Sequence, residues 1–306
     1  MNRREFLQKL ALAGVAAGAA GLTGRPLGLF GQEPGAAGFP DLVAVKNGPS
    51  EVMFDRAVLA MGGLNRFFNK GDTVVIKPNI GWDKPPEAGA NTNPILVARI
   101  VQRCLESGAG KVIVFDHTCD EAAACYRNSM IEKYAKEAGA RIAPGGAKGY
   151  YQEVTIAGAK TLKKTMVHEL ILEADAWINV PVLKSHGGAG MTAAMKNLMG
   201  IVWDRGMFHS SGLDSCIADI CLYRKPVLNV VDAWNVMLTQ GPRGTAASRY
   251  RQEKMLILST DIVAADSAAA RVMGKEPAAF PYIGFGHDRK AGSRDLDSLA
   301  IERIVM

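Results

Sequence analysis

The chain has 306 residues, of which 48% are hydrophobic and 22% charged, the balance of a globular protein with ample material for a core. Its formal net charge is +6, but four basic and one acidic residue within positions 1–32 account for +3 of that charge. The remaining +3 is too small to indicate nucleic-acid binding, and no basic helix carries interleaved aromatic residues. We therefore expect no nucleic-acid partner.

Residues 1–37 have the pattern of a twin-arginine signal peptide followed by a linker. Arg3 and Arg4 precede a mildly apolar run at residues 10–22, which is too short and too rich in glycine for a membrane span. This pattern predicts a periplasmic or extracytoplasmic protein whose partner during export is the twin-arginine machinery. Because that pathway carries proteins that are already folded, the signal also favours a metal or redox cofactor without identifying one.

Residues 38–306 alternate apolar strands with amphipathic helices, which predicts a single domain of the α/β class. We expect a largely parallel sheet, with a mixed sheet as the alternative, and helices on both faces in three layers. Asn93 and Pro94 are typical of a helix N-terminus. The expected strands are residues 42–46, 72–80, 111–115, 176–183, 225–231, 255–259 and 301–306, and the expected helices are 51–64, 94–107, 121–138, 166–173, 192–200, 213–221 and 262–274. One or two antiparallel strands are expected within 141–164, and an irregular tail from residue 277.

The five cysteines do not form a disulfide framework, because they are few, odd in number and spread through a large domain. Cys216 and Cys221 fall on the apolar stripe of one helix, which favours packing in the core. Cys119 and Cys125 leave a loop disulfide open. No ferredoxin-type cysteine motif occurs, so an iron–sulfur cluster is less favoured than a metal ion.

The segment from residue 176 to 200 contains the largest group of candidate functional residues. A buried strand leads into Lys184, Ser185 and His186, and a glycine run then precedes a helix that carries Lys196 and Asn197. Free backbone N–H groups at a helix N-terminus, with ammonium groups nearby, would bind an anion. The alternative is a glycine-rich connection with solvated lysines.

Polar residues follow five of the expected strands, at Lys77 and Asn79, Asp116 and His117, Lys184 to His186, Asp232, and Thr260 and Asp261. Open α/β sheets bind ligands beyond the carboxyl ends of their strands. The recurrence of polar residues after five strands predicts one polar cleft at that edge of the sheet.

Asp266 lies on the apolar face of the last long helix, where a carboxylate needs a partner. Lys77, Lys184 or a bound cation are the candidate partners. A structural ion pair and a functional site are equally favoured.

Five segments together resemble the "domain of unknown function 362" family of bacteria and archaea. They are Ile76 to Asn79, Val182 to His186, Met195 to Gly200, Val231 and Asp232 with Gly241 to Gly244, and Asp261 with Asp266. The resemblance runs from about residue 42 to the C-terminus. It implies motif roles for Lys77, Asn79, Lys184, His186, Lys196, Asn197, His209, Asp232, Asp261 and Asp266, but no particular reaction. Some members of the family carry a ferredoxin-type cluster, for which this chain lacks the cysteines.

Three functions fit these residues. The first is an enzyme that acts on a small anionic substrate, with a histidine as acid or base because imidazole titrates near neutral pH. The second is a metal or redox protein, with a redox partner protein, in which imidazole and carboxylate ligands would suit iron, zinc or manganese. The third is a non-catalytic anion-binding protein. We rank the enzyme first, with Lys184, His186, His209 and Asp232 as catalytic residues, Lys77, Asn79, Lys196, Asn197 and Asp266 as anion-binding residues, and His117, His186 and His209 as the metal ligands.

Overall fold

The computed structural model describes residues 38–306, so the predicted signal peptide and linker lie outside the described residues. One large sheet has the strand order β12-β1-β11-β10-β7-β2-β3-β4, and β8 joins it by pairing with β10 and β9. Its strands are β1 (Leu42–Lys46), β2 (Thr73–Pro78), β3 (Lys111–Val114), β4 (Arg141–Ile142), β7 (Ala176–Val180), β8 (Val182–His186), β9 (Gly190–Thr192), β10 (Leu228–Met237), β11 (Tyr250–Ser259) and β12 (Ile301–Val305). A separate antiparallel pair is formed by β5 (Tyr151–Thr155) and β6 (Lys164–His168).

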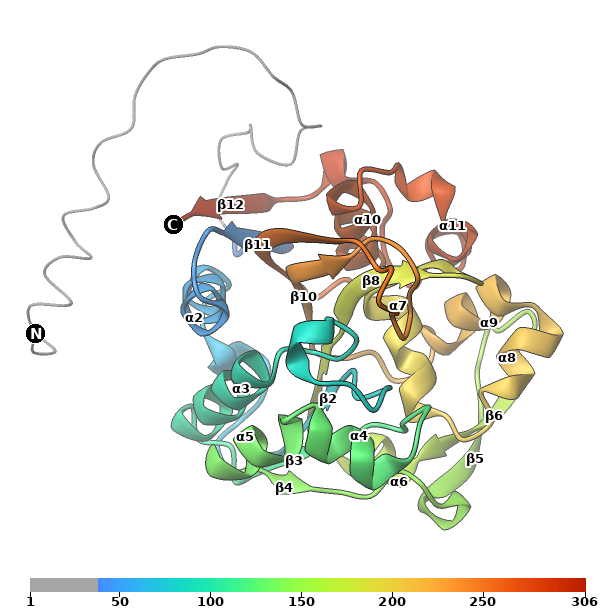
Figure 1. The fold of residues 1–306 in the computed structure, drawn as a ribbon, viewed down its shortest axis with the longest axis horizontal. Coiled ribbons are helices and arrows are strands. Elements are labelled where there is room, and N and C mark those ends of the chain that lie inside the picture. Colours follow the sequence, from blue (N-terminus) through green and yellow to red (C-terminus); the bar gives the residue numbers. More distant parts are fainter. Residues whose placement is uncertain (1–37) are drawn as a thin grey trace, which may run out of the picture.

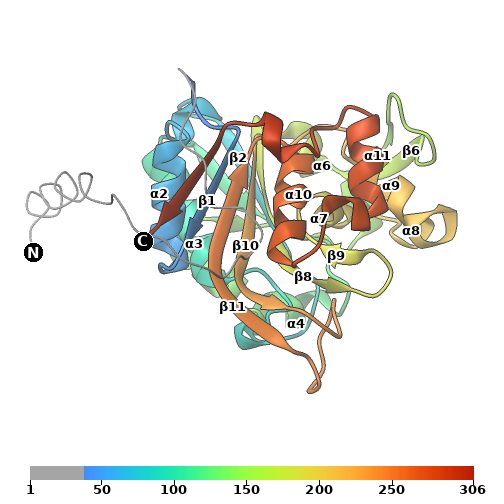
Figure 2. The same ribbon diagram turned by 90° about the horizontal axis from the view of Figure 1, so that it is seen from above.

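Helices cover both faces of this sheet, as Figure 2 shows most directly. On one face lie α2 (Ser50–Ala60), α3 (Pro94–Glu106), α4 (Ala122–Asn128) and α5 (Ile131–Glu137). On the other face lie α6 (Glu169–Glu173), α7 (Ala194–Asn197), α8 (Gly206–Ser211), α9 (Leu213–Ile220), α10 (Ile262–Val272) and α11 (Pro281–Asp288). The predicted three-layer α/β fold with a mixed, mostly parallel sheet is confirmed (Figure 1).

The alternation of side chains along the strands builds a separate core on each face. In β1, Val43 and Val45 pack with α2 and α3, whereas Leu42 and Ala44 belong to the core on the face of α7 to α11. Successive side chains of a strand point to opposite faces, so a strand that is buried on both faces reads as a continuous apolar run.

Several expected boundaries are correct, and others are wrong for local reasons. Asn93 caps α3 as predicted, since its side chain accepts a hydrogen bond from the backbone N–H of Ile95. The expected helix at 121–138 divides into α4 and α5 because Met130 has a left-handed φ of 63°. The tail predicted to be irregular contains α11, and the expected helix at 166–173 is shortened because residues up to His168 belong to β6.

The glycine run after His186 does not open a helix. Instead, β8 turns back as a hairpin into β9, with Lys184 opposite Thr192, and α7 begins only at Ala194. The expected helix at 192–200 is therefore wrong at its start, and its last part is a 3₁₀ turn, Leu198–Ile201. The anion site predicted from the glycine run at a helix N-terminus does not exist in that form.

The direction of β11 also changes the expected cleft. This strand runs antiparallel to both β1 and β10, so its carboxyl end, with Asp261, lies at the opposite edge of the sheet from the ends of the parallel strands. Asp261 caps α10 there by accepting from the N–H groups of Val263 and Ala264. Within residues 38–306, none of the helices combines the length and the hydrophobicity that a bilayer crossing requires.

Candidate functional site

A cavity of about 300 Å³ lies where β2, β3 and β8 end, between these strands and the segment that follows α7. Eight of the residues proposed from the sequence line it: Lys77, Asn79, His117, Lys184, His186, Lys196, Asn197 and, on α8, His209. Residues that are separated by more than one hundred positions in the chain therefore meet at one edge of the sheet, as the strand-end pattern predicts.

Lys77 forms the floor of the cavity and is fully buried with Asp116. Its Nζ lies 2.7 Å from Asp116 Oδ1 and donates to the carbonyl of Pro78 (2.8 Å) and to Asn197 Oδ1 (2.9 Å). Burial lowers the pKa of Lys77, and the Asp116 carboxylate opposes that effect. Two hydrogen bonds and the ion pair with Asp116 occupy the ammonium group, so Lys77 orders the site rather than binding a ligand directly.

A chain of side-chain amides extends from Lys184 through the sheet. Lys184 donates to Asn79 Oδ1 (3.1 Å), Asn79 Nδ2 to Asn197 Oδ1 (2.9 Å), and Asn197 Nδ2 to Asn179 Oδ1 (2.8 Å). Asn179 Nδ2 then donates to Asn229 Oδ1 (2.9 Å), whose own amide donates to the carbonyl of Ser259 (3.2 Å). Each amide accepts on one side and donates on the other, which orients Asn79 toward the lysine.

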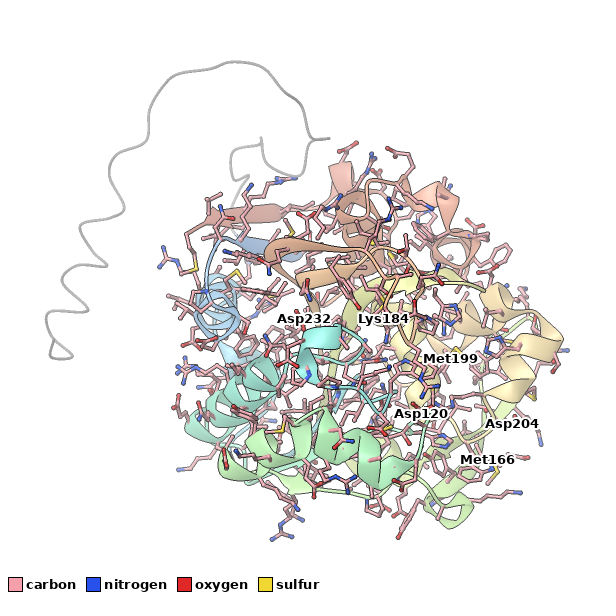
Figure 3. The ribbon with its side chains drawn as sticks, viewed as in Figure 1. Asp120, Met166, Lys184, Met199, Asp204 and Asp232 are labelled. Carbon is pink, nitrogen blue, oxygen red and sulfur yellow. The ribbon has the colours of Figure 1, made fainter. Side chains whose placement is uncertain are left out.

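Two other lysines face the cavity without a carboxylate partner. Lys184 is 1% exposed and donates only to Asn79 and to the carbonyl of Ala90. Burial, together with the neighbouring charges of Lys196 and Lys77, lowers the pKa of Lys184 to about 7. Lys196 donates to the thioether of Met199 (3.4 Å), and burial lowers its pKa to about 8. Lys184 and Met199, both labelled in Figure 3, line the same cavity near the centre of the view.

Two of the cavity histidines, His186 and His117, form hydrogen bonds with backbone groups. His186 Nδ1 accepts hydrogen bonds from the N–H groups of Gly188 (3.0 Å) and Ala189 (3.1 Å) in the β8–β9 turn. Burial, followed by the charges of Lys196, His209 and Lys184, lowers the pKa of His186 to about 3.

His117 has the opposite arrangement. Its Nδ1 lies 2.9 Å from the carbonyl oxygen of Val202, which can only accept, and its ring stacks on Trp203 at a centroid distance of 5.1 Å. Burial lowers its pKa below the ordinary value.

The three histidines predicted as metal ligands lie at the cavity without a complete set of ligands around them. Within residues 38–306, no group of three or more histidine, cysteine, aspartate or glutamate side chains is placed to hold a metal ion. His117, His186 and His209 all line the cavity, but the Nδ1 atoms of His117 and His186 are already engaged with the backbone. The Nε2 atoms of His117 and His186 have no hydrogen-bond partner among the described residues, so the role of these histidines as metal ligands stays a prediction.

Asp232 and Asp266 lie outside the cavity. Asp232 sits within β10 rather than at its end, because β10 continues to Met237, and its carboxylate accepts from the N–H groups of Asn93 (2.9 Å) and Trp234 (3.1 Å). It lines a different cavity of about 590 Å³, and in Figure 3 it lies on the side of Lys184 away from Met199. The geometry thus separates it from the catalytic residues with which it was grouped.

Asp266 caps α7 instead of meeting a lysine or a cation. Its carboxylate accepts from the N–H groups of Ala194 (2.5 Å) and Met195 (3.2 Å), so the anion at this helix N-terminus belongs to the protein itself. Burial raises the pKa of Asp266 to about 7. Its effect on the site is indirect, because it holds the helix that carries Lys196.

Several cavity residues were not proposed as site residues from the sequence, among them Arg205, Cys119 and Thr192. Arg205 donates to the carbonyls of His117 (2.8 Å) and Thr118 and to Cys119 Sγ (3.2 Å), which ties the segment before α8 to the loop after β3. Cys119 and Thr192 also line the cavity. Thr192 is 4% exposed, and its hydroxyl has no hydrogen-bond partner in the described part of the chain. The sequence placed Thr192 on the same helix side as Lys196, but the residue lies on β9 instead.

The cysteines are all free. Cys119 is exposed and Cys125 is buried, so the loop disulfide that the sequence left open is not formed. Cys216 and Cys221 are buried in the core, as predicted.

The family model described as "Domain of unknown function (DUF362)" matches residues 74–271, well over half of the chain. The chain belongs to this family. Every residue that lines the cavity of this DUF362 protein, from Lys77 to Pro242, lies within the matched range. It is also similar to a thylakoid-associated protein of Synechocystis sp., with 26% identity over 232 residues that cover 73% of this chain and 70% of the relative.

Two solved structures resemble this DUF362 protein more distantly. One is the lactate racemase apoprotein from Thermoanaerobacterium thermosaccharolyticum, with 13% identity and a TM-score of 0.42 over 69% of this chain and 54% of that one. The other is a Thermotoga maritima protein, with 11% identity and a TM-score of 0.45 over 73% of this chain and 59% of that one. The chain spans little more than half of each structure, and neither likeness bears on its reaction.

Proposed function

We propose that this protein is an enzyme that acts on a small anionic substrate in the cavity at the ends of β2, β3 and β8. The observation that carries the proposal is a surplus of positive charge. Lys184, Lys196 and Arg205 line the cavity, whereas Asp116 is the one carboxylate among the lining residues and is paired with Lys77. A buried cation without a counter-ion is costly, and a bound anion removes that cost.

The size of the cavity supports a small substrate. Its volume of about 300 Å³ is at the lower limit of ordinary ligand cavities. Such a volume suits a compact carboxylate or phosphate rather than a polymer. The unpartnered hydroxyl of Thr192 adds a neutral hydrogen-bonding group for such a ligand.

Catalysis is favoured over simple binding because of the protonation states. The pKa values of Lys184 and Lys196 are lowered to about 7 and about 8, and both side chains face the same cavity as the histidines. Groups whose pKa values are shifted toward neutrality and that converge in one cavity are typical of catalytic sites.

Titration calorimetry with inorganic phosphate and with pyruvate tests the proposal. We expect Lys196→Gln to weaken binding at least tenfold, since the substitution removes a charge that has no counter-ion among residues 38–306. The control is Lys148→Gln, which removes an exposed lysine outside the cavity. The proposal would be contradicted if the unaltered protein bound neither phosphate nor pyruvate. Equal affinities of the Lys196→Gln and Lys148→Gln variants would contradict it as well.

We also propose that the protein acts outside the cytoplasm, after export through the twin-arginine pathway. Arg3 and Arg4 before the mildly apolar run at residues 10–22 support this location.

A further inference from the structure

The hydrogen bonds of His117 and His186 indicate that their protons lie on different ring nitrogens. A ring nitrogen that accepts a hydrogen bond cannot carry a proton, so His186, whose Nδ1 accepts from Gly188 and Ala189, holds its proton on Nε2. A ring nitrogen that faces a carbonyl oxygen must donate, so His117, whose Nδ1 faces Val202, leaves Nε2 without a proton. The backbone thus sets one imidazole as a donor and the other as an acceptor.

Both free nitrogens are available to a ligand. In the described part of the chain, neither His117 Nε2 nor His186 Nε2 has a hydrogen-bond partner, and both residues line the cavity. His117 follows β3 and His186 ends β8, so the two rings approach from different strands of the sheet. Lys184 shares its face of β8 with His186, because the two residues are two positions apart on a strand.

We propose that the cavity catalyses proton transfer at a carbon next to a carbonyl group, with His117 as the base and His186 as a neutral hydrogen-bond donor to the carbonyl oxygen. This inference rests on the proposed function, and it names the substrate class as small carboxylic acids that carry such a carbonyl. Lys196 is the counter-ion of the substrate carboxylate.

The chemistry of this step is balanced. His117 Nε2 takes the proton from carbon, and the electron pair of that C–H bond becomes the C=C bond of an enolate. The carbonyl electrons move to oxygen, and the resulting oxyanion accepts the hydrogen bond from His186 Nε2–H. Return of a proton from His117 to carbon completes an exchange that needs no oxidant or reductant.

A neutral imidazole suits the donor role better than an imidazolium. Burial, and then the charges of Lys196, His209 and Lys184, disfavour a second proton on the ring of His186. A neutral donor can stabilise an enolate oxygen without losing its own proton to it, which is how a preorganised donor lowers the barrier.

The first test needs no ligand. Nitrogen-15 spectra of the histidine rings, assigned with His117→Gln and His186→Gln, should show the proton on Nδ1 of His117 and on Nε2 of His186 from pH 6.5 to 9. A proton on the other nitrogen of either ring would overturn the inference, whatever the protein binds.

The second test follows exchange of the C3 hydrogens of pyruvate with deuterated water by proton NMR. We expect His117→Gln to lower the maximal exchange rate at least ~100-fold, the range of a lost general base. His186→Gln keeps an N–H donor and should retain more of the rate than His186→Leu, and Lys196→Gln should raise the half-saturating concentration of pyruvate more than it lowers the maximal rate.

Calorimetry with phosphate separates the two proposals. If phosphate binds but the protein exchanges neither pyruvate nor 2-oxobutyrate, the inference is wrong and the proposed function stands. If neither phosphate nor pyruvate binds, both are wrong. Equal exchange rates in His117→Gln and the unaltered protein would likewise overturn the role of His117.

Discussion

Lys77 and Lys184 are both fully buried, yet their neighbours give them different roles. Lys77 has two hydrogen-bond acceptors and an ion pair with the Asp116 carboxylate, whereas Lys184 has an amide and a backbone carbonyl. The first lysine completes a buried ion pair, and the second retains one N–H group, or a lone pair, for a ligand. The sequence places both lysines at strand ends but cannot distinguish them, because the distinction depends on Asp116, which is distant in the chain.

Replacing Lys77 should therefore destabilise the fold more than replacing Lys184. Lys77→Met leaves Asp116 buried without its partner, and breaking a buried pair in this way costs about 3–5 kcal/mol. Lys184→Met leaves no carboxylate unpaired and should cost at least about 2 kcal/mol less than Lys77→Met. Urea unfolding of the two variants measures the difference. Equal losses of unfolding free energy would show that Asp116 does not depend on Lys77.

The affinity of the cavity for an anion should fall as pH rises. Lys184 and Lys196 have pKa values lowered to about 7 and about 8 without a ligand, and an anion favours their charged forms, so binding takes up protons. We expect the affinity for sulfate, whose charge is constant over this range, to drop about tenfold or more between pH 7 and pH 9. Calorimetry in two buffers of different ionisation enthalpy measures the proton uptake. A flat pH profile, or a release of protons on binding, would contradict this assignment.

At the scale of elements, α7 depends on a residue from another helix. Asp266 of α10 accepts from the first N–H groups of α7, and burial raises its pKa from 3.8 to about 7. Because the pKa is higher in the folded state than in the unfolded state, the contribution of Asp266 to stability is complete below about pH 4 and is lost as pH rises through 7.

Asp266→Asn should remove this pH dependence. The full contribution is about 4 kcal/mol, because the pKa of Asp266 is raised from 3.8 to about 7. The variant should therefore lose less unfolding free energy than the unaltered protein when the pH is raised from 4 to 7. Urea unfolding at several pH values measures the two slopes. Identical slopes would mean that Asp266 keeps an ordinary pKa in the folded protein.

Gly200 marks the point where the segment after α7 passes over the buried ion pair. A Cβ atom there would lie 2.0 Å from Asp116 Oδ1 and 2.6 Å from Lys77 Nζ. Gly200→Ala should therefore displace the pair and cost about 3 kcal/mol, the upper part of the range for an overpacked core. Gly187→Ala is the matched control, because no atom lies within 4 Å of the added Cβ. Thermal unfolding compares them, and equal midpoints would contradict this close contact.

The sequence predicts these elements better than their directions and partners. Periodicity and caps locate β1, α3 and α10 closely, because those signals are local. The hairpin from β8 to β9 and the antiparallel direction of β11 depend on long-range pairing that no local pattern contains. Asn179 and Asn229 were the missed signal, since asparagines inside apolar strands require buried partners.

At the scale of the whole molecule, the parallel strands explain why most of the cavity could be predicted. The carboxyl ends of β2, β3 and β8 meet at one edge, so Lys77, His117 and Lys184 converge regardless of their separation in the chain. Asp232 and Asp261 were misplaced because β10 extends beyond Asp232 and β11 runs in the opposite direction. The prediction of which residues line the cavity therefore depended on the direction and the length of each strand.

The predicted export can be tested on the whole chain in a bacterial host that has the twin-arginine pathway. Replacing Arg3 and Arg4 together by lysine keeps the charge but removes the arginine pair that the export machinery reads as an address. We expect the protein to move from the periplasmic to the cytoplasmic fraction, measured by immunoblotting after osmotic shock.

Arg25→Lys, which makes the same exchange outside the pair, is the control and should be exported normally. Because the substitutions lie outside the described domain, the phosphate affinity of both purified variants should equal that of the unaltered protein. An unchanged distribution of the doubly substituted protein would contradict export by this route and would leave the chemistry of the cavity unaffected.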